Sequence, residues 1–292
     1  MHFMESDCKT MKFTNNEKAQ IDFDMEVPYI SFPVLSKIPF IKHGFSTRLG
    51  GVSKGFYTSM NLGSPKLEVR DKPENIKENF ERIAKSIGVE PESLVVSDQV
   101  HKTTVRLVNR SDRGKGLYRD RDYKEVDGLI TNQAGVTLAT KYADCVPLFF
   151  VDPVMKAIGA SHAGWKGTVG KIGHITVNEM SKHFQSNPKD IIAVIGPSIC
   201  QDCYEVGEEV IVQFKDAFDN KWLEDIISKN NKGRYQLDLW QANKIVLLEA
   251  GLKPENIHIS SVCTSCNSDL LFSHRKSKGK RGSLAAFLAI DE

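Results

Sequence analysis

The sequence lacks any long hydrophobic run, and none reaches the ~18 apolar residues that a membrane-spanning helix needs. The polar stretch over residues 1–20 also lacks the apolar centre of a secretory signal peptide. A formal net charge of +2, from 39 basic and 37 acidic side chains, is far from the strongly basic character of proteins that bind nucleic acid. We therefore expect a soluble, cytoplasmic protein that binds neither nucleic acid nor membrane, and whose partner is a small molecule.

From residue 28 onward the sequence has no Pro/Ser-rich linker, low-complexity run or internal repeat. Nothing therefore divides this part into two domains, and its length is sufficient for a sizeable core. The first 27 residues mix charged and apolar side chains without a helical or alternating period. We predict a flexible extension over residues 1–27 and one domain over residues 28–292.

An amphipathic helix is predicted over residues 73–87, because apolar side chains recur at spacings of three and four between a proline and a glycine. Further helical spacing covers residues 169–184, 205–218 and 237–250. Strand-length runs of branched residues cover 94–96, 105–108, 136–140, 148–151, 191–195 and 284–290. The irregular order of these elements favours an α+β fold with mixed sheets over a regular Rossmann or barrel pattern.

Three potential metal ligands lie at or after the ends of predicted strands. They are His101, Cys145 and His162. Two imidazoles and one thiolate, with a fourth position left for water, are typical of catalytic zinc. Their spacing matches no short zinc motif, so packed or hydrogen-bonded core side chains are the alternative. A second alternative is that Cys145 acts as a nucleophile with one of the histidines as its base.

An arginine beside two glycines indicates an anion site or, equally, an ordinary hairpin turn: Arg48 precedes Gly50 and Gly51. Asn61, two residues before a further glycine, is typical of a turn. The basic, glycine-containing stretch over residues 274–282 is predicted to be an exposed loop, with recruitment of anions as the alternative.

Four further cysteines form two C-x-x-C pairs, Cys200 with Cys203 and Cys263 with Cys266. In a reducing cytosol such pairs suggest a structural zinc site or a redox dithiol. The segment between the pairs is much longer than the roughly 15–20 residues of a zinc ribbon and contains a predicted helix. We therefore expect these cysteines to be packed thiols.

Several motifs occur in order along the chain: F-S-T-R-L-G-G-V-S, N-L-G, D-Q-V-H, D-G-L-I-T, A-D-C-V-P, H-A-G-W-K-G, G-P-S-I, C-Y-E-V-G and F-S-H-R. Together they resemble the YfiH/LACC1-type purine nucleoside phosphorylases, formerly called multicopper polyphenol oxidoreductases or laccase-domain proteins. The resemblance runs from about Phe45 to Ile290. It implies a four-layer α/β/β/α sandwich. The basic loop departs from the family pattern, because it lacks the usual acidic residue.

The resemblance also implies a set of functional residues. His101, Cys145 and His162 would hold a metal, zinc or alternatively copper, and take part in catalysis. Arg48 would be catalytic and, with Asn61, would bind substrate. The family suggests no role for Cys200 or Cys266.

The implied activity is phosphorolysis of adenosine, inosine, guanosine and methylthioadenosine, together with deamination of adenosine. An arginine can position phosphate below the ribose and stabilise the charge that develops there, while a metal can activate water for attack on the purine. One alternative is a cytosolic hydrolase that edits peptidoglycan precursors. A copper-dependent polyphenol oxidase is disfavoured, because its copper centres need more histidines than the eight present. A non-catalytic metal-binding scaffold is a further alternative.

Overall fold

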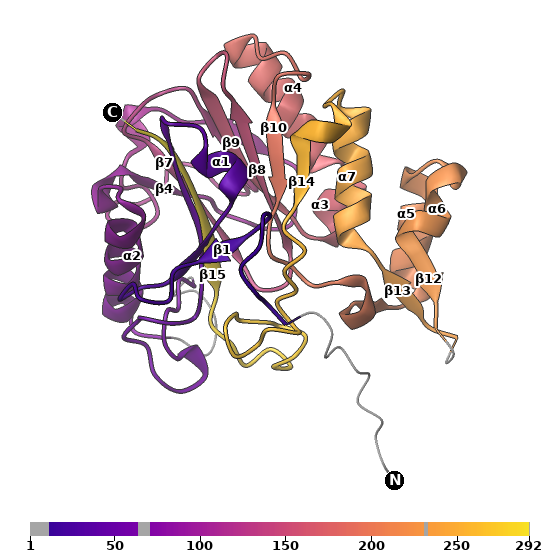
Figure 1. Ribbon diagram of the computed structural model, residues 1–292, viewed down its shortest axis with the longest axis horizontal. Helices are drawn as coiled ribbons and strands as arrows, with labels where there is room; N and C mark the ends of the chain where they lie inside the picture. The colour runs from indigo at the N-terminus through magenta and orange to yellow at the C-terminus, as the bar shows by residue number, and fades with distance from the viewer. Residues whose placement is uncertain (1–11, 64–70, 231–232, 292) are drawn as a thin grey trace.

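The computed structural model describes residues 12–63, 71–230 and 233–291. Its centre consists of two six-stranded sheets that face each other, with helices on both outer faces (Figure 1). The first sheet has the order β1 (Gln20–Ile21), β2 (Tyr29–Ser31), β3 (Ile41–Ser46), β15 (Leu284–Ile290), β7 (Thr137–Tyr142) and β4 (Leu94–Val96). The second has the order β14 (Ile257–Ile259), β10 (Ile192–Ile195), β8 (Val146–Asp152), β9 (Ala157–Ala163), β6 (Gly128–Thr131) and β5 (Val105–Leu107).

Helix α2 covers the outer face of the first sheet, and α3, α4 and α7 lie on the outer side of the second (Figure 1). A small third sheet with α5 and α6 lies beyond α7. The helices are α1 (Pro33–Ser36), α2 (Pro73–Ile87), α3 (Trp165–Val169), α4 (Ile172–Phe184), α5 (Glu208–Ala217), α6 (Asn220–Ile226) and α7 (Leu239–Glu249). The third sheet contains β11 (Glu205–Val206), β13 (Tyr235–Leu237) and β12 (Ile227–Lys229). Short 3₁₀ turns are η2 (Gly55–Tyr57), η3 (Pro91–Ser93), η4 (Arg110–Asp112), η5 (Gln201–Cys203) and η6 (Pro254–Asn256).

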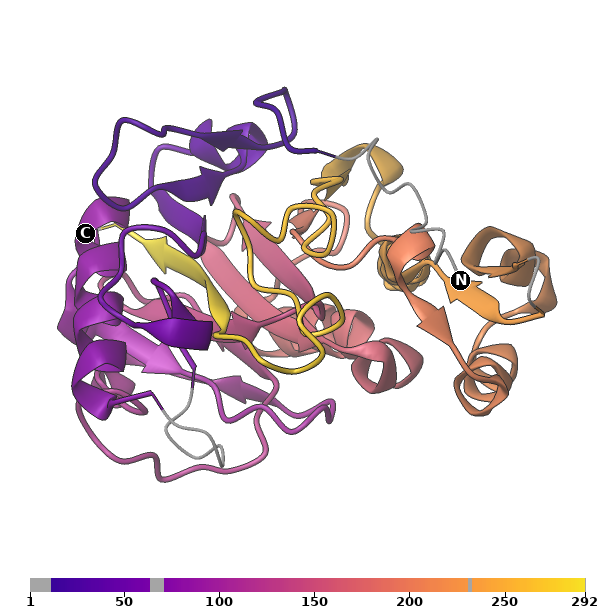
Figure 2. The same cartoon turned by 90° about the horizontal axis from the view of Figure 1, so that it is seen from below.

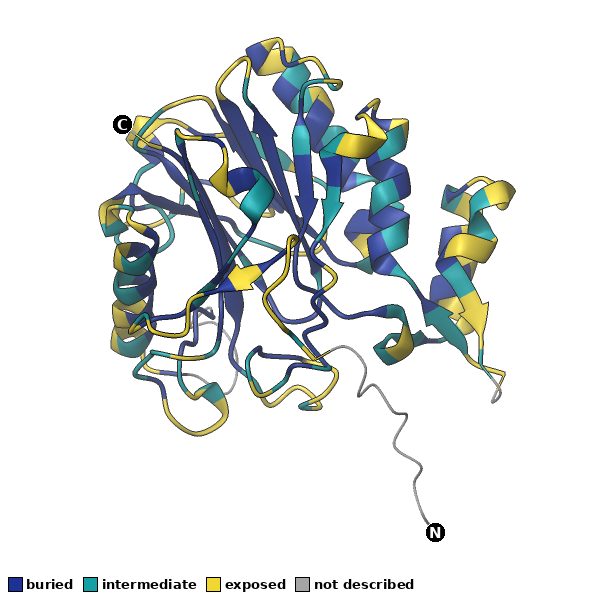
Figure 3. Cartoon of the chain, viewed as in Figure 1, coloured by how far each residue is buried: buried dark blue, intermediate teal, exposed yellow. Residues whose placement is uncertain are grey.

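Strand β8 shows why the sheets form the inner layers. All of its residues are buried (Figure 3), and alternate side chains enter two different cores. Phe149 packs between the two sheets, where it meets the ring of Phe32 edge-on at 5.1 Å. Phe150 points to the helix side and joins the core that includes Met180 of α4. Because both faces are buried, the strand is almost uniformly apolar, and the predicted four-layer sandwich with mixed sheets is confirmed.

The predicted strands are present in the sheets, and two predicted helices have different bounds. The helix predicted over residues 169–184 is divided at Gly170 into α3 and α4. In the segment predicted as a helix from 205 to 218, residues 205–206 form β11 and the helix begins after Gly207. None of the helices in the described part of the chain combines the length and apolar character needed to cross a bilayer.

The extension expected to be flexible over residues 1–27 is partly incorporated in the fold, which corrects that prediction. Residues 1–11 lie outside the described part, but β1 pairs with β2, and Ala19 and Ile21 are buried. The backbone N–H of Phe13 donates to Asn267 Oδ1 at 2.7 Å. A two-residue edge strand is too short to produce an alternating pattern, so no local pattern predicts it.

Acid is expected to destabilise the protein through His43, a buried residue of β3. Its Nε2 accepts the backbone N–H of Phe32 at 2.8 Å, and burial lowers the pKa of His43 to about 4 from 6.5. The unfolded chain therefore binds this proton at a higher pH than the folded chain does. The stability that His43 contributes is complete above pH 6.5 and is lost as the pH falls toward 4.

Between pH 7 and pH 5 this residue should lower the free energy of unfolding by about 2 kcal/mol. Urea unfolding of the protein and of the His43→Gln variant at both pH values measures the effect, since a glutamine oxygen can still accept the Phe32 N–H. The variant should be less sensitive to acid by that amount. Equal sensitivity in the two proteins would contradict the prediction.

Candidate active site

The three predicted metal ligands meet at one end of the second sheet. His101 comes from the loop between β4 and β5, Cys145 from the turn between β7 and β8, and His162 from β9. Their potential ligand atoms all lie within 4.8 Å of one another. The two imidazole rings are 4.8 Å apart and nearly perpendicular, at 68°. The structure thus brings together residues that are far apart in the sequence.

The turn that presents Cys145 is held by bonds to distant segments. Asp144 has a φ of 86°, in a region that residues other than glycine rarely adopt. Its carboxylate accepts the hydroxyl of Thr264 at 2.6 Å and the backbone N–H of Arg275 at 2.7 Å. These two hydrogen bonds fix the strained turn and therefore the direction of the neighbouring thiol. His101 also has a positive φ, of 62°.

Asp127 organises both histidines. One carboxylate oxygen accepts His162 Nδ1 at 2.8 Å and the backbone N–H of His101 at 3.0 Å. The other accepts the N–H groups of Val100 and Lys102, each at 3.0 Å. Burial by itself would raise the pKa of Asp127, but these hydrogen bonds outweigh it and lower that pKa. The carboxylate is therefore ionised, so Nδ1 of His162 donates and its Nε2 is left for a ligand.

Sequence reasoning assigned no role to Asp127. It begins the D-G-L-I-T motif, one of those on which the resemblance rests. The motif was therefore a signal for Asp127. Its role was missed because Asp127 is not itself a candidate metal ligand: it orients the candidate ligand His162, and the sequence does not show that these two residues are in contact.

Cys145, which is half-buried, and His162, which is buried, form a charge pair at neutral pH. Burial alone would raise the pKa of Cys145, but the charge of His162 and hydrogen bonds from both imidazoles lower it to about 6. Burial alone would lower the pKa of His162, but the Cys145 thiolate and Asp127 raise it to about 9. A thiolate is the form of cysteine that binds metals and attacks electrophiles. The site is therefore equipped for either role.

Gly164, at the start of α3, has to be a glycine because of this site. A Cβ atom there would lie 2.6 Å from His101 Nδ1 and 3.2 Å from Cys145 Sγ. The first separation is shorter than any ordinary contact, and the ring it meets is part of the cluster. The glycine of the H-A-G-W motif thus leaves room for the three ligand atoms.

The cluster opens into a pocket of about 460 Å³, within the range of small-molecule sites. Positive side chains line it in addition to the cluster: Lys141, Arg275 and Arg281. The aromatic rings of Trp165 and Tyr204 also contribute to its wall. The pocket therefore combines a metal-binding set, cationic groups and flat apolar surfaces. A larger hollow of about 970 Å³ beside α2 shares Lys141, but its lining contains neither group of potential metal ligands.

Two predicted substrate residues do not line the pocket. Arg48 donates to the carbonyl oxygens of Thr58 at 2.9 Å and Ser268 at 2.8 Å. Asn61 Oδ1 accepts the backbone N–H of Ser283 at 2.9 Å, and Ser283 does line the pocket. Asn61 therefore supports the pocket wall indirectly, through its hydrogen bond with the backbone of Ser283.

The basic loop is exposed at its centre, as predicted, but its ends reach the pocket. His274, Arg275 and Arg281 are lining residues. Figure 2 shows the segment leading to β15 beneath the ends of the strands. The prediction of an exposed loop therefore holds only for the centre of the loop. The strand order places both of its ends beside the His101–Cys145–His162 cluster. The sequence could not show this, since the loop and the cluster are joined only through the sheets.

Comparison with known proteins agrees with this fold. Residues 42–291 match the family model described as multi-copper polyphenol oxidoreductase laccase. A protein of Bacillus subtilis named purine nucleoside phosphorylase YlmD is 42% identical over 255 residues, covering 85% of this chain and 88% of the relative. A protein from an unknown prokaryotic organism, named adenosine deaminase RL5, is 36% identical and covers 83% of this chain and 93% of its own.

Among solved structures, the Bacillus licheniformis hypothetical protein YfiH superimposes with a TM-score of 0.85. It is 33% identical, and the match covers 93% of this chain and 99% of that one. The B. subtilis relative and the RL5 relative both carry the names of enzymes, so the prediction of an enzyme is confirmed.

Proposed function

This chain belongs to the family described as multi-copper polyphenol oxidoreductase laccase, and on that premise we propose that it is a purine nucleoside phosphorylase that also deaminates adenosine. The proposed substrates are adenosine, inosine, guanosine and methylthioadenosine, with phosphate as the second substrate. The names of two relatives support the two activities. We assign the activity to residues 28–292 as one catalytic domain, with β1 as an added edge strand.

The observation that carries the proposal is the joint placement of the His101–Cys145–His162 cluster and several cationic side chains in one pocket. Phosphorolysis needs positive groups to hold phosphate near the glycosidic bond, and deamination needs a nucleophilic water near the purine. Aromatic walls suit the faces of a purine base. One pocket thus offers what both reactions require.

The donor set fits a zinc ion. Two imidazole nitrogens and a thiolate are ligands that zinc accepts in catalytic sites, and Asp127 fixes the tautomer that turns Nε2 of His162 toward the site. When bound, zinc supplies a Lewis acid that lowers the pKa of water. Copper is the alternative metal. Among the described residues only one group of potential ligands contains histidine, which does not suit a multicopper oxidase.

We assign phosphate binding to Arg281 in preference to Arg48. Its guanidinium lines the pocket and donates to Ser283 Oγ at 2.8 Å, which holds it in place. Arg48, the residue suggested by the family resemblance, is bound to two backbone carbonyls outside the pocket. In this proposal Arg48 and Asn61 contribute to substrate binding by supporting the loops that form the wall.

Replacing Arg281 by glutamine should raise the KM for phosphate by about 10–100-fold, because one charge-assisted contact is lost. Deamination, which uses no phosphate, should change little. Initial rates at varied phosphate measure the effect, and Lys278→Gln, an exposed position in the same loop, is the matched control. A larger effect from Arg48→Gln than from Arg281→Gln would move the phosphate site to Arg48.

The activity itself is tested by incubating zinc-loaded protein with adenosine, with and without phosphate, and separating the products. Adenine and ribose-1-phosphate formed only with phosphate would establish the phosphorylase. Inosine in both samples would establish the deaminase. If none of these products forms, the proposal fails, and hydrolysis of peptidoglycan precursors becomes the activity to test.

A further inference from the structure

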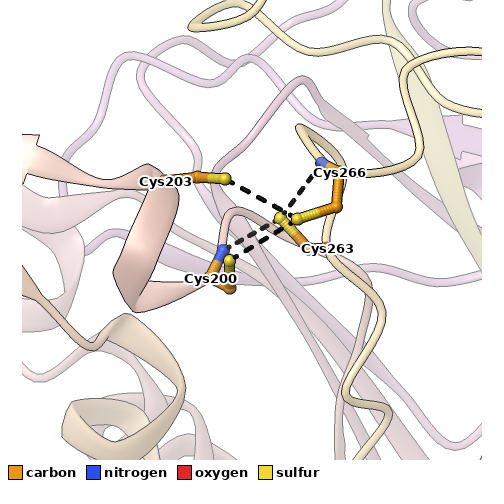
Figure 4. A group of neighbouring side chains, drawn as sticks. All are labelled: Cys200, Cys203, Cys263 and Cys266. Carbon is orange, nitrogen blue, oxygen red and sulfur yellow. Dashed lines mark hydrogen bonds between the residues drawn. The ribbon is translucent and has the colours of Figure 1, made fainter. Parts of the chain in front are cut away.

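Four cysteines outside the active site form a compact sulfur cluster (Figure 4). All four sulfur atoms lie within 4.8 Å of one another. Two of the separations are 3.9 Å, from Cys200 to Cys266, and 3.7 Å, from Cys203 to Cys266. In a tetrahedral site with zinc–sulfur bonds of ~2.3 Å, neighbouring sulfurs are about 3.8 Å apart. The cluster therefore has the dimensions of a tetrathiolate zinc site.

The sheet topology brings the two C-x-x-C pairs together. Strands β10 and β14 are parallel neighbours, so the segments that follow them leave the sheet at the same end. Beyond the strands, a further bridge pairs Ser198 with Cys263, with Thr264 N–H donating to the Ser198 carbonyl at 3.1 Å. The cysteines are packed, as expected, but the length of the intervening segment does not keep the two pairs apart. That segment leaves the sheet and returns beside its starting point.

Backbone N–H groups around the cluster donate hydrogen bonds to one of its sulfur atoms. The N–H of Cys200 donates to Cys263 Sγ at 3.3 Å, and the N–H of Cys266 donates to the same atom at 3.4 Å. Such donors stabilise a thiolate and orient it as a ligand. Cys200 and Cys263 are also buried. A metal bound by all four cysteines would have no open position, which is the arrangement of a structural zinc site.

The oxidation state of the cluster matters for this role. In the structure Cys266 carries a disulfide bond, whereas Cys200, Cys203 and Cys263 are not disulfide-bonded. We propose that reduction of the Cys266 disulfide turns the cluster into a structural site that binds one Zn²⁺ through Cys200, Cys203, Cys263 and Cys266. A dithiol reductant supplies the two electrons and becomes a disulfide itself, and the two protein sulfurs become thiols. Zinc then binds the four thiolates and releases their protons.

The site lies directly behind the catalytic turn. Ile199, next to Cys200, donates its N–H to the carbonyl of Asp144 at 3.0 Å. Thr264, next to Cys263, donates its hydroxyl to the carboxylate of the same aspartate. Zinc at the cluster would therefore hold two segments that fix the turn before Cys145. The proposal does not depend on the activity assigned to the pocket.

The test uses full-length protein reduced with a phosphine, with the Cys145→Ser substitution to remove the active-site thiolate. After zinc loading and desalting, this variant should retain one zinc per chain by elemental analysis. Cys145→Ser/Cys203→Ser should lose it. Protein left oxidised should bind less zinc than reduced protein. Equal zinc content in the single and double variants would overturn the proposal.

A second measurement does not depend on whether the double variant folds. Reduced Cys145→Ser protein loaded with Co²⁺ should show the intense sulfur-to-cobalt charge-transfer bands and visible spectrum of a tetrahedral tetrathiolate. A spectrum typical of nitrogen or oxygen ligands would also overturn the proposal. Because Cys145 is already replaced, neither result is affected by failure of the active-site metal proposal.

Discussion

Replacing Cys145 by serine should lower the rates of phosphorolysis and deamination together, each by at least about 10³-fold. The reason is the same for both reactions, because the thiolate lies at the centre of the only described group of potential ligands that contains histidine. A serine hydroxyl stays protonated at neutral pH and is both a weaker metal ligand and a weaker nucleophile. Initial rates with adenosine, with and without phosphate, measure the two losses.

Zinc analysis of the same variant separates the two roles left open for this cysteine. In reduced protein whose four-cysteine cluster is filled, loss of the remaining zinc together with activity identifies Cys145 as a ligand. Retention of that zinc with loss of activity identifies it as the nucleophile. Circular dichroism checks that the fold is kept. Unchanged rates of both reactions would refute the proposal of a shared site.

Replacing Asp127 by asparagine should lower kcat by about 10–100-fold and weaken zinc binding by a similar factor. An amide has one acceptor oxygen, whereas the carboxylate now accepts four hydrogen bonds through two oxygens. The amide nitrogen would face N–H donors, so either His162 or the loop that carries His101 must move. The KM for nucleoside should change less, because Asp127 is completely buried and does not line the pocket.

Zinc affinity, measured by competition with a chelator, gives a readout that a general loss of stability would not produce. Asp98→Asn is the matched control, because Asp98 lies in the loop that carries His101, accepts the N–H of Glu125 and does not line the catalytic pocket. Its zinc affinity should be close to that of the unchanged protein. An equal loss in both variants would mean that Asp127 only maintains the loop.

Elements with a clear local pattern can be predicted from their own residues. Helix α2 was predicted because its apolar stripe, proline start and glycine end all lie within one short segment. The buried strand β8 was predicted because a strand covered on both faces has to be apolar throughout. The ligand trio was predicted from ordered motifs that resemble a known family, since each ligand lies within its own motif.

Which distant segments meet depends on the packing of the whole fold. The parallel pairing of β10 with β14 places the two C-x-x-C pairs side by side. The position of β15 places Arg281, which precedes this strand, at the pocket. Asp127 gained its role when β6 was placed beside β9, where its carboxylate reaches His162. No local pattern encodes these contacts, because strand order depends on how all the apolar faces are buried together. The candidate metal ligands could therefore be predicted from the sequence. The contacts that hold and surround them could not, because they depend on the order of the strands.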